Sequence, residues 1–62
     1  MFCRIEILKR DERTKRVVAK RCAIGRDISE IEKIAGQVRR KLNADGYRMR
    51  DLHTNRTEVV WD

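Results

Sequence analysis

The sequence predicts a small α+β domain of ββαββ order, in which one amphipathic helix packs on a mainly antiparallel sheet of about four strands. Three observations predict this class. Apolar residues recur at helical spacing within residues 27–46, residues 2–8 alternate in polarity, and polar turn residues separate the apolar runs on either side of the helix. The chain of 62 residues is therefore interpreted as one domain spanning residues 1–62.

Length and composition limit how stable such a domain can be. A chain this short buries only about 60% of the surface that its unfolded form exposes. Charged residues make up 42% of the chain, and the aromatic residues are Phe2, Tyr47 and Trp61. We therefore expect a folded domain that gains burial from a partner, most simply from a second copy in a homodimer.

Residues 2–8 and 17–24 are expected to form the first hairpin, with the polar run 9–16 as its turn and strand ends. A turn centred on Glu12 and Arg13 predicts one helix-facing surface, made of Cys3, Ile5, Ile7, Val18, Cys22 and Ile24. Lys20 does not suit that surface, so either its long stem reaches past the edge or a bulge moves it. Apolar residues also fall on the opposite surface, which indicates that another molecule partly covers it.

The helix is the clearest element of the chain. Its apolar stripe consists of Ile28, Ile31, Ile34, Ala35, Val38 and Leu42. Either Asp27 with Glu30 or Ser29 with Glu32 can form the capping box at its start. Gly46 is expected to end it in a left-handed conformation.

A second hairpin is predicted from residues 47–53 and 58–62, with its turn at residues 54–57. Pairing across Asn55 and Arg56 places Leu52 opposite Val59, and Arg50 opposite Trp61. The other surface would carry Tyr47, Met49, Asp51 and Val60, and the sequence leaves open which of the two surfaces belongs to the core.

The positive charge is concentrated in one part of the chain. The net charge is +6, and residues 9–26 contain eight basic and two acidic residues, whereas the rest of the chain is balanced. This placement predicts a nucleic-acid-binding module that contacts the phosphates of DNA or RNA through the first hairpin. The candidate contact residues are Lys9, Arg10, Arg13, Lys15, Arg16, Lys20 and Arg21. A solvated hairpin end that protects a strand edge is the alternative, and Arg48 and Arg50 near Trp61 are a further candidate for stacking a base.

The sequence gives little indication of a catalytic or metal-binding site. His53 and Asp51 lack an identifiable nucleophile, so we expect no catalytic site. Cys3, Cys22 and His53 fall one ligand short of a closed zinc site, and two buried thiols are the preferred interpretation; no metal or other cofactor is expected. The two cysteines favour a cytoplasmic location with free thiols, and the short apolar runs argue against a membrane-spanning segment.

The order of elements, a basic hairpin followed by a helix, resembles that of the arm-binding domains of phage-type integrases, which implies DNA binding. The chain departs from them in having two strands rather than three before the helix, and no residue roles carry over. A second hypothesis is a protein-binding inhibitor or adaptor, such as a phage or mobile-element protein that blocks a host nucleic-acid-binding complex, with an acidic protein surface as its partner. An endoribonuclease of the toxin type is disfavoured because histidine chemistry is lacking.

Overall fold

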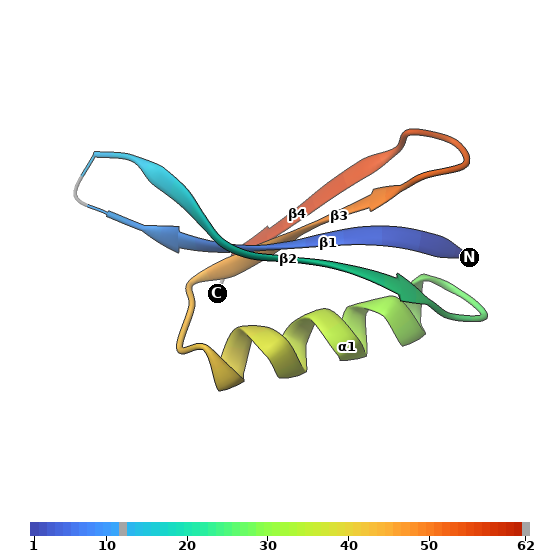
Figure 1. Cartoon of the computed structure of the whole chain (residues 1–62), viewed down its shortest axis with the longest axis horizontal. Coiled ribbons are helices and arrows are strands. Elements are labelled where there is room, and N and C mark those ends of the chain that lie inside the picture. The colour runs from blue at the N-terminus through green and yellow to red at the C-terminus, as the bar shows by residue number, and fades with distance from the viewer. Residues whose placement is uncertain (12, 62) are drawn as a thin grey trace.

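The computed structural model describes residues 1–11 and 13–61 and shows one sheet with one helix on it (Figure 1). In chain order the elements are β1 (Phe2–Arg10), β2 (Lys15–Ile24), α1 (Ile28–Lys41), β3 (Gly46–Asp51) and β4 (Thr57–Trp61). The strands lie in the order β2-β1-β3-β4, and every neighbouring pair is antiparallel. The predicted ββαββ architecture is therefore confirmed.

Hydrogen bonds from side chains at one end of the helix and from the backbone at the other explain where it begins and ends. The Asp27 carboxylate accepts the N–H of Glu30, while the Glu30 carboxylate accepts the N–H of Arg26, so the first of the two predicted capping registers is correct. At the other end Asn43, with φ of 52°, takes the left-handed conformation that had been expected of Gly46. The N–H groups of Asn43 and Ala44 then bond to the carbonyls of Arg40 and Arg39, which is a Schellman motif.

The core lies between α1 and the middle of the sheet. Alternate residues of β1 point toward the helix, and Cys3, Ile5 and Ile7 are completely buried there. Ile31 and Ala35 of the helix and Met49 of β3 complete the same cluster. In the part of the chain described here, the helix is too short and too polar to cross a membrane.

A bulge in the first hairpin changes the predicted surface of β2. Near the turn Arg10 pairs with Lys15, as expected, but beyond Leu8 the register shifts and Val18 becomes an extra residue. The far end is fixed by two backbone hydrogen bonds between Met1 and Gly25. Since the two ends of the hairpin differ by one residue in register, the strand must absorb that residue between them.

Beyond the bulge, the residues of β2 therefore lie on the side of the sheet opposite to the one predicted. Ala19 and Ala23 lie on the helix side opposite Ile7 and Cys3, whereas Lys20 lies on the opposite side of the sheet, paired with Glu6. The bulge thus removes the predicted conflict of a lysine beneath the helix. Arg21 takes that position instead, and it remains exposed at the sheet edge, where its long stem reaches water.

The two cysteines are separated by the same shift. Cys3 pairs with Ala23 and is buried, whereas Cys22 pairs with Arg4 and is exposed. The predictions that Cys22 shares the helix-facing surface with Cys3 and that its thiol is buried are therefore wrong, whereas the burial of Cys3 is confirmed. Burial raises the pKa of the Cys3 thiol, and the nearby Asp51 carboxylate raises it further.

The second hairpin has the predicted faces but a different register. Arg50 faces Thr57 rather than Trp61, and Arg48 faces Val59, because the connection is longer than a two-residue turn. The Asp51 carboxylate accepts the N–H groups of His53 and Thr54 and thereby orders this connection. These hydrogen bonds hold the pKa of Asp51 below its usual range, the one from His53 contributing most. Met49 is buried, so its face belongs to the core.

Candidate nucleic-acid interface

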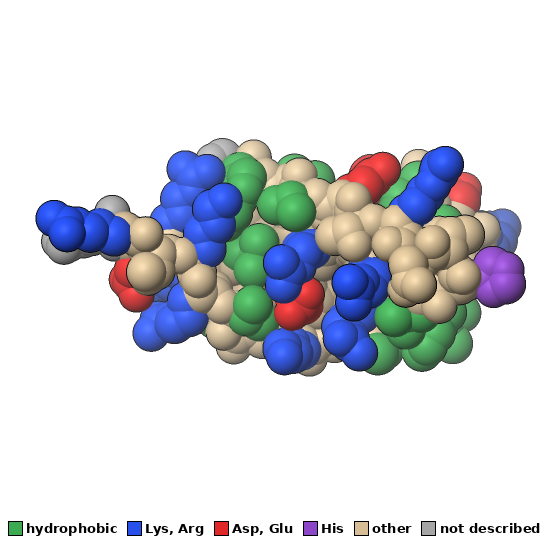
Figure 2. Space-filling view, turned by 90° about the horizontal axis from the view of Figure 1, so that it is seen from above, with side chains coloured by type: hydrophobic (Ala, Val, Ile, Leu, Met, Phe, Trp, Pro, Cys, Tyr) green, Lys and Arg blue, Asp and Glu red, His purple; other side chains and the backbone are tan. Residues whose placement is uncertain are grey.

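The face of the sheet opposite α1 is not covered by any described part of the chain, and we call it the open face (Figure 2). Strand pairing places corresponding residues of the four strands in rows across it. From the turn of the first hairpin outward, these rows are Arg10 and Lys15; Val17, Leu8, Gly46 and Trp61; Lys20, Glu6, Arg48 and Val59; Cys22, Arg4, Arg50 and Thr57; and Phe2 with Ile24.

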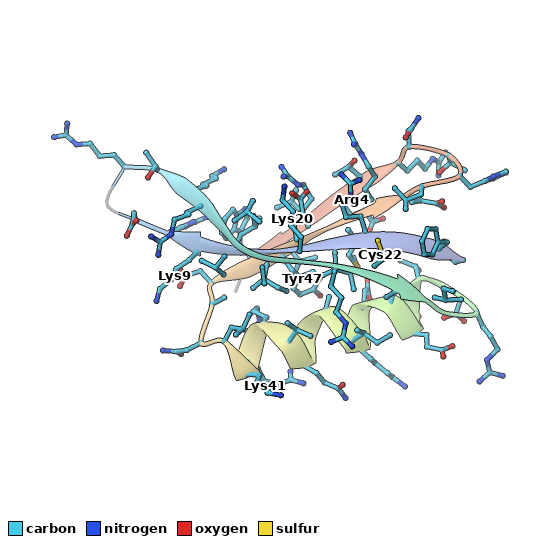
Figure 3. All side chains as sticks on the ribbon, viewed as in Figure 1. Arg4, Lys9, Lys20, Cys22, Lys41 and Tyr47 are labelled. Carbon is cyan, nitrogen blue, oxygen red and sulfur yellow. The ribbon has the colours of Figure 1, made fainter. Side chains whose placement is uncertain are left out.

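The open face is strongly cationic. Six of its residues are basic and one is acidic, the basic ones being Arg4, Arg10, Lys15, Lys20, Arg48 and Arg50. The other carboxylates within the described parts of the strands, those of Asp51 and Glu58, belong to the helix side. Figure 2 shows lysine and arginine side chains along the length of this face, and Figure 3 shows Arg4 and Lys20 on the side away from α1.

The predicted contact residues are divided between the two sides of the hairpin. Arg10, Lys15 and Lys20 lie on the open face. Lys9, Arg16 and Arg21 alternate with them and lie on the opposite side. Arg13 is in the connection between the strands, which projects beyond the helix and the other two strands, and Glu12 lies outside the described residues (Figure 1).

Three arginines that were not among the predicted phosphate contacts complete the open face. Arg4, Arg48 and Arg50 come from segments whose charges balance along the chain. They lie near Lys20 because β1 pairs with β2 on one side and with β3 on the other, so that neighbouring residues form rows across all three strands. The alternation of Arg48 and Arg50 with Met49 was the available indication, but only the strand order places them beside the first hairpin.

One ion pair lies at the centre of the open face. A guanidinium nitrogen of Arg48 is 2.7 Å from Glu6 Oε1, and Nε of the same arginine donates to that oxygen at 2.8 Å. The two contacts fix the direction of Arg48. Among the described residues, the other five cations of the open face form no ion pair with a carboxylate, so their charge is available to a ligand.

Trp61 lies against the hairpin end of this face. Its ring rests on Gly46, where an added Cβ would come within 2.7 Å of the ring atom Cε3. The Arg10 guanidinium lies over the ring, 4.3 Å from its centroid, and the Lys15 ammonium is 5.2 Å away. The prediction that Arg50 lies opposite Trp61 is wrong, because the register of β4 places the ring opposite Gly46 and beside the first hairpin.

The opposite end of the open face is apolar. Phe2 pairs with Ile24 across the first hairpin, and their exposed fractions are 46% and 76%. At the start of β1 the Cys3 side chain lies in the core, so the neighbouring Phe2 ring lies on the other side of the sheet and is partly exposed to water. The open face therefore has Phe2 at one end and Trp61 near the other, with four of its six cations in the rows between the two rings and Arg10 and Lys15 beyond Trp61.

His53, the residue considered with Asp51 as a catalytic pair, lies in the connection between β3 and β4. The Asp51 carboxylate accepts the backbone N–H of His53 and so orders the turn, and the imidazole is exposed. Within residues 1–11 and 13–61, histidine, cysteine and acidic side chains do not gather into a group that suits a metal ion. Comparison of the chain with protein-family models, with curated proteins and with solved structures finds no match.

Proposed function

We propose that this protein binds nucleic acid, DNA or RNA, through the open face of its sheet. The observation that carries the proposal is the gathering of six basic side chains with one acidic side chain on the uncovered face. The hairpin cations predicted from the sequence contribute Arg10, Lys15 and Lys20, and the turn residue Arg13 extends the contact region beyond the sheet.

The chemistry of this face suits phosphates. Phosphates that bind to lysine or arginine release their condensed counterions, so affinity falls as salt concentration rises. Arginine can bind a phosphate with two parallel hydrogen bonds, and Arg4 and Arg50 are directly paired across β1 and β3. Glu6 repels a phosphate directly above it and holds Arg48 in place, so we expect the backbone to run along the rows on either side of this pair.

The test combines a salt titration with a footprint on the native cysteines. Fluorescence anisotropy with labelled single-stranded and double-stranded DNA and RNA is expected to show binding that weakens steeply between about 50 and 200 mM salt. Bound nucleic acid should slow the alkylation of Cys22, which is exposed on the open face beside Arg4. Buried Cys3 serves as the internal control for unfolding.

Two outcomes would contradict the proposal. One is a lack of binding to all four probes at low salt. The other is salt-sensitive binding that leaves the alkylation rate of Cys22 unchanged, since contact would then occur away from the open face.

A second candidate function, binding of another protein as an inhibitor or adaptor, is favoured by the exposed edge of β4. This strand pairs on one side only, and Val59 and Val60 are exposed with Glu58 as its one charged residue between Thr57 and Trp61. The β2 edge, by contrast, carries Lys15, Arg16, Lys20 and Arg21, charges that oppose pairing with a further strand. The β4 edge can therefore accept a strand, and a second copy of the chain is the partner that can be tested directly.

Analytical ultracentrifugation across a concentration series tests whether the β4 edge accepts a strand from a second copy of the chain. A weak dimer is expected to dissociate when Val59→Lys introduces a charge at the β4 edge. Val18→Lys, at an exposed valine of the β2 edge, is the matched control and should leave the association unchanged. A chain that is monomeric at all concentrations, or a dimer that both variants disrupt equally, would contradict association through β4.

A further inference from the structure

The width of the open face distinguishes between two kinds of nucleic acid. Four strands spaced by about 4.8 Å make a surface about 14 Å across before side chains are added. The major groove of B-form DNA is about 12 Å wide and admits a two-stranded ribbon or a helix. The four-stranded part of the open face therefore cannot enter a groove and can touch a duplex only along its outer phosphates, whereas a single strand can lie across it.

The aromatic side chains support the same distinction. In a duplex the faces of the bases are stacked on each other, so an aromatic ring reaches them only by unstacking a base step, whereas the bases of a single strand are free to stack on it. Phe2 is the exposed ring on this face, at the end away from the hairpin turn. It lies one row beyond the Arg4 and Arg50 pair, so a nucleotide held by these arginines can place its base on Phe2.

The other end of the face offers a second planar group. One side of the Trp61 ring rests on Gly46, and Arg10 lies over the ring. A base approaching here therefore meets the guanidinium of Arg10, which stacks on bases as aromatic rings do. Trp61 acts as the support that holds this guanidinium above the sheet.

The spacing of the two ends sets the length of the bound strand. The row of Trp61 and the row of Phe2 are six residue steps apart along β1, from Leu8 to Phe2, which is about 20 Å at about 3.4 Å per residue. At the duplex rise of about 3.4 Å per nucleotide this distance accommodates about six nucleotides, and a more extended strand needs fewer.

From these observations, and resting on the proposed function, we infer that the open face binds single-stranded nucleic acid in preference to a duplex. One base stacks on Phe2, another stacks on the guanidinium of Arg10, and the phosphates between them lie on Arg4, Arg50 and Lys20. The stacking roles of Phe2 and Arg10 were not evident in the sequence, where Phe2 is one residue of a strand of alternating polarity.

The experiment compares three probes at one salt concentration: a single-stranded oligonucleotide of about eight nucleotides, the duplex of the same sequence, and an abasic strand of equal length. The native protein is expected to bind the single strand at least about tenfold more tightly than either of the other two. Phe2→Leu keeps the apolar character of the side chain but removes its ring. We expect it to weaken binding of the base-containing single strand about tenfold, and to leave binding of the duplex and the abasic strand unchanged.

Two controls accompany this variant. Phe2→Tyr should preserve the preference, because it keeps the ring, and Ile24→Leu should have no effect, because it changes a neighbouring apolar side chain without adding or removing a ring. Circular dichroism and the fluorescence of Trp61, the single tryptophan of the chain, establish that each variant is folded.

The outcomes separate this inference from the proposed function. If the duplex or the abasic strand binds as tightly as the single strand, or if Phe2→Leu weakens all three probes equally, the inference is overturned while phosphate binding stands. If none of the probes binds at low salt, both fail. A preference for the single strand that Phe2→Leu removes and Phe2→Tyr retains supports the inference.

Discussion

The two faces of the sheet differ although they are made from alternate residues of the same strands. On the helix side, β1 contributes Cys3, Ile5 and Ile7, all completely buried. On the open face the same strand contributes Arg4, Glu6 and Arg10. The comparison teaches that burial against α1 selects the residues of one face, while the other face is free to collect charge from three strands.

The largest expected difference between the faces is in thiol reactivity. Cys22 on the open face should react with an alkylating reagent at the rate of a free thiol. Cys3 can react only when the structure opens, so a stability of about 5 kcal/mol slows its reaction by roughly three to four orders of magnitude. Burial also raises the pKa of Cys3, which lowers its thiolate fraction further. Mass spectrometry with timed quenching measures both rates, and similar rates for the two cysteines would contradict the difference in burial.

Binding should respond to the face on which cations are removed. The triple variant Arg4→Ala, Lys20→Ala and Arg50→Ala should lose about a hundredfold in affinity for single-stranded DNA at about 0.1 M salt, with a salt dependence reduced by two to three contacts (roughly one unit of slope per cation). Anisotropy titrations across salt concentrations measure both quantities.

The matched control removes the same number of charges from the helix side. Lys9→Ala, Arg16→Ala and Arg21→Ala give an equal change in net charge, and we expect a loss of less than about tenfold from the weaker general field. A greater loss in this variant than in the open-face variant would show that the hairpin binds with its other side.

Gly46 lies where the Trp61 ring covers β3, and Gly46→Ala should disturb this part of the open face. An added Cβ would lie 2.5 Å from the Val60 carbonyl oxygen and 2.7 Å from the Trp61 ring, so both the ring and the backbone of β4 must move. We expect a loss of about 2 kcal/mol in the free energy of unfolding, in the range for overpacking. Urea unfolding measures it, and a shifted emission of Trp61 in the folded protein should accompany it. Unchanged stability and emission would contradict the placement of the ring on Gly46.

The same substitution on the helix should have the opposite sign. Gly36 lies within α1, and an added Cβ would meet only Arg40 Nη1, at 3.7 Å. Gly36→Ala should therefore raise the free energy of unfolding by about 1 kcal/mol through helix propensity and leave nucleic-acid binding unchanged. Destabilisation on urea unfolding would show that the space beside Gly36 is needed for packing.

The smallest expected effect concerns the turn that positions β4. Because hydrogen bonds to its carboxylate lower the pKa of Asp51, this group stabilises the fold above its unfolded pKa of about 3.9, and that contribution is lost as pH falls through the lower folded value. Asp51→Asn should make the free energy of unfolding less dependent on pH between about pH 5 and pH 2. Urea unfolding at several pH values tests this, and an unchanged pH profile would contradict the role of Asp51.

The local pattern of residues was sufficient to predict much of the fold and three of the six cations of the open face. The helix, its Asp27 cap, the buried side of β1 and the two groupings of residues in the second hairpin follow from side-chain periodicity within short segments. Arg10, Lys15 and Lys20 were identified from the concentration of charge along the chain. Arg4, Arg48 and Arg50 were not, because charge counted along the chain takes no account of which side of a strand each residue occupies.

The sequence by itself determined the element types and the apolar stripe of α1, since these depend on spacings of two and of three to four residues. The tertiary structure alone decided the side on which Lys20 and Cys22 lie, the support of Trp61 by Gly46, and the assembly of one cationic face. The physical reason is that strand order and register depend on constraints at distant points, such as the hydrogen bonds between Met1 and Gly25 and the turn held by Asp51. A shift of one residue at those points exchanges the two faces of a strand.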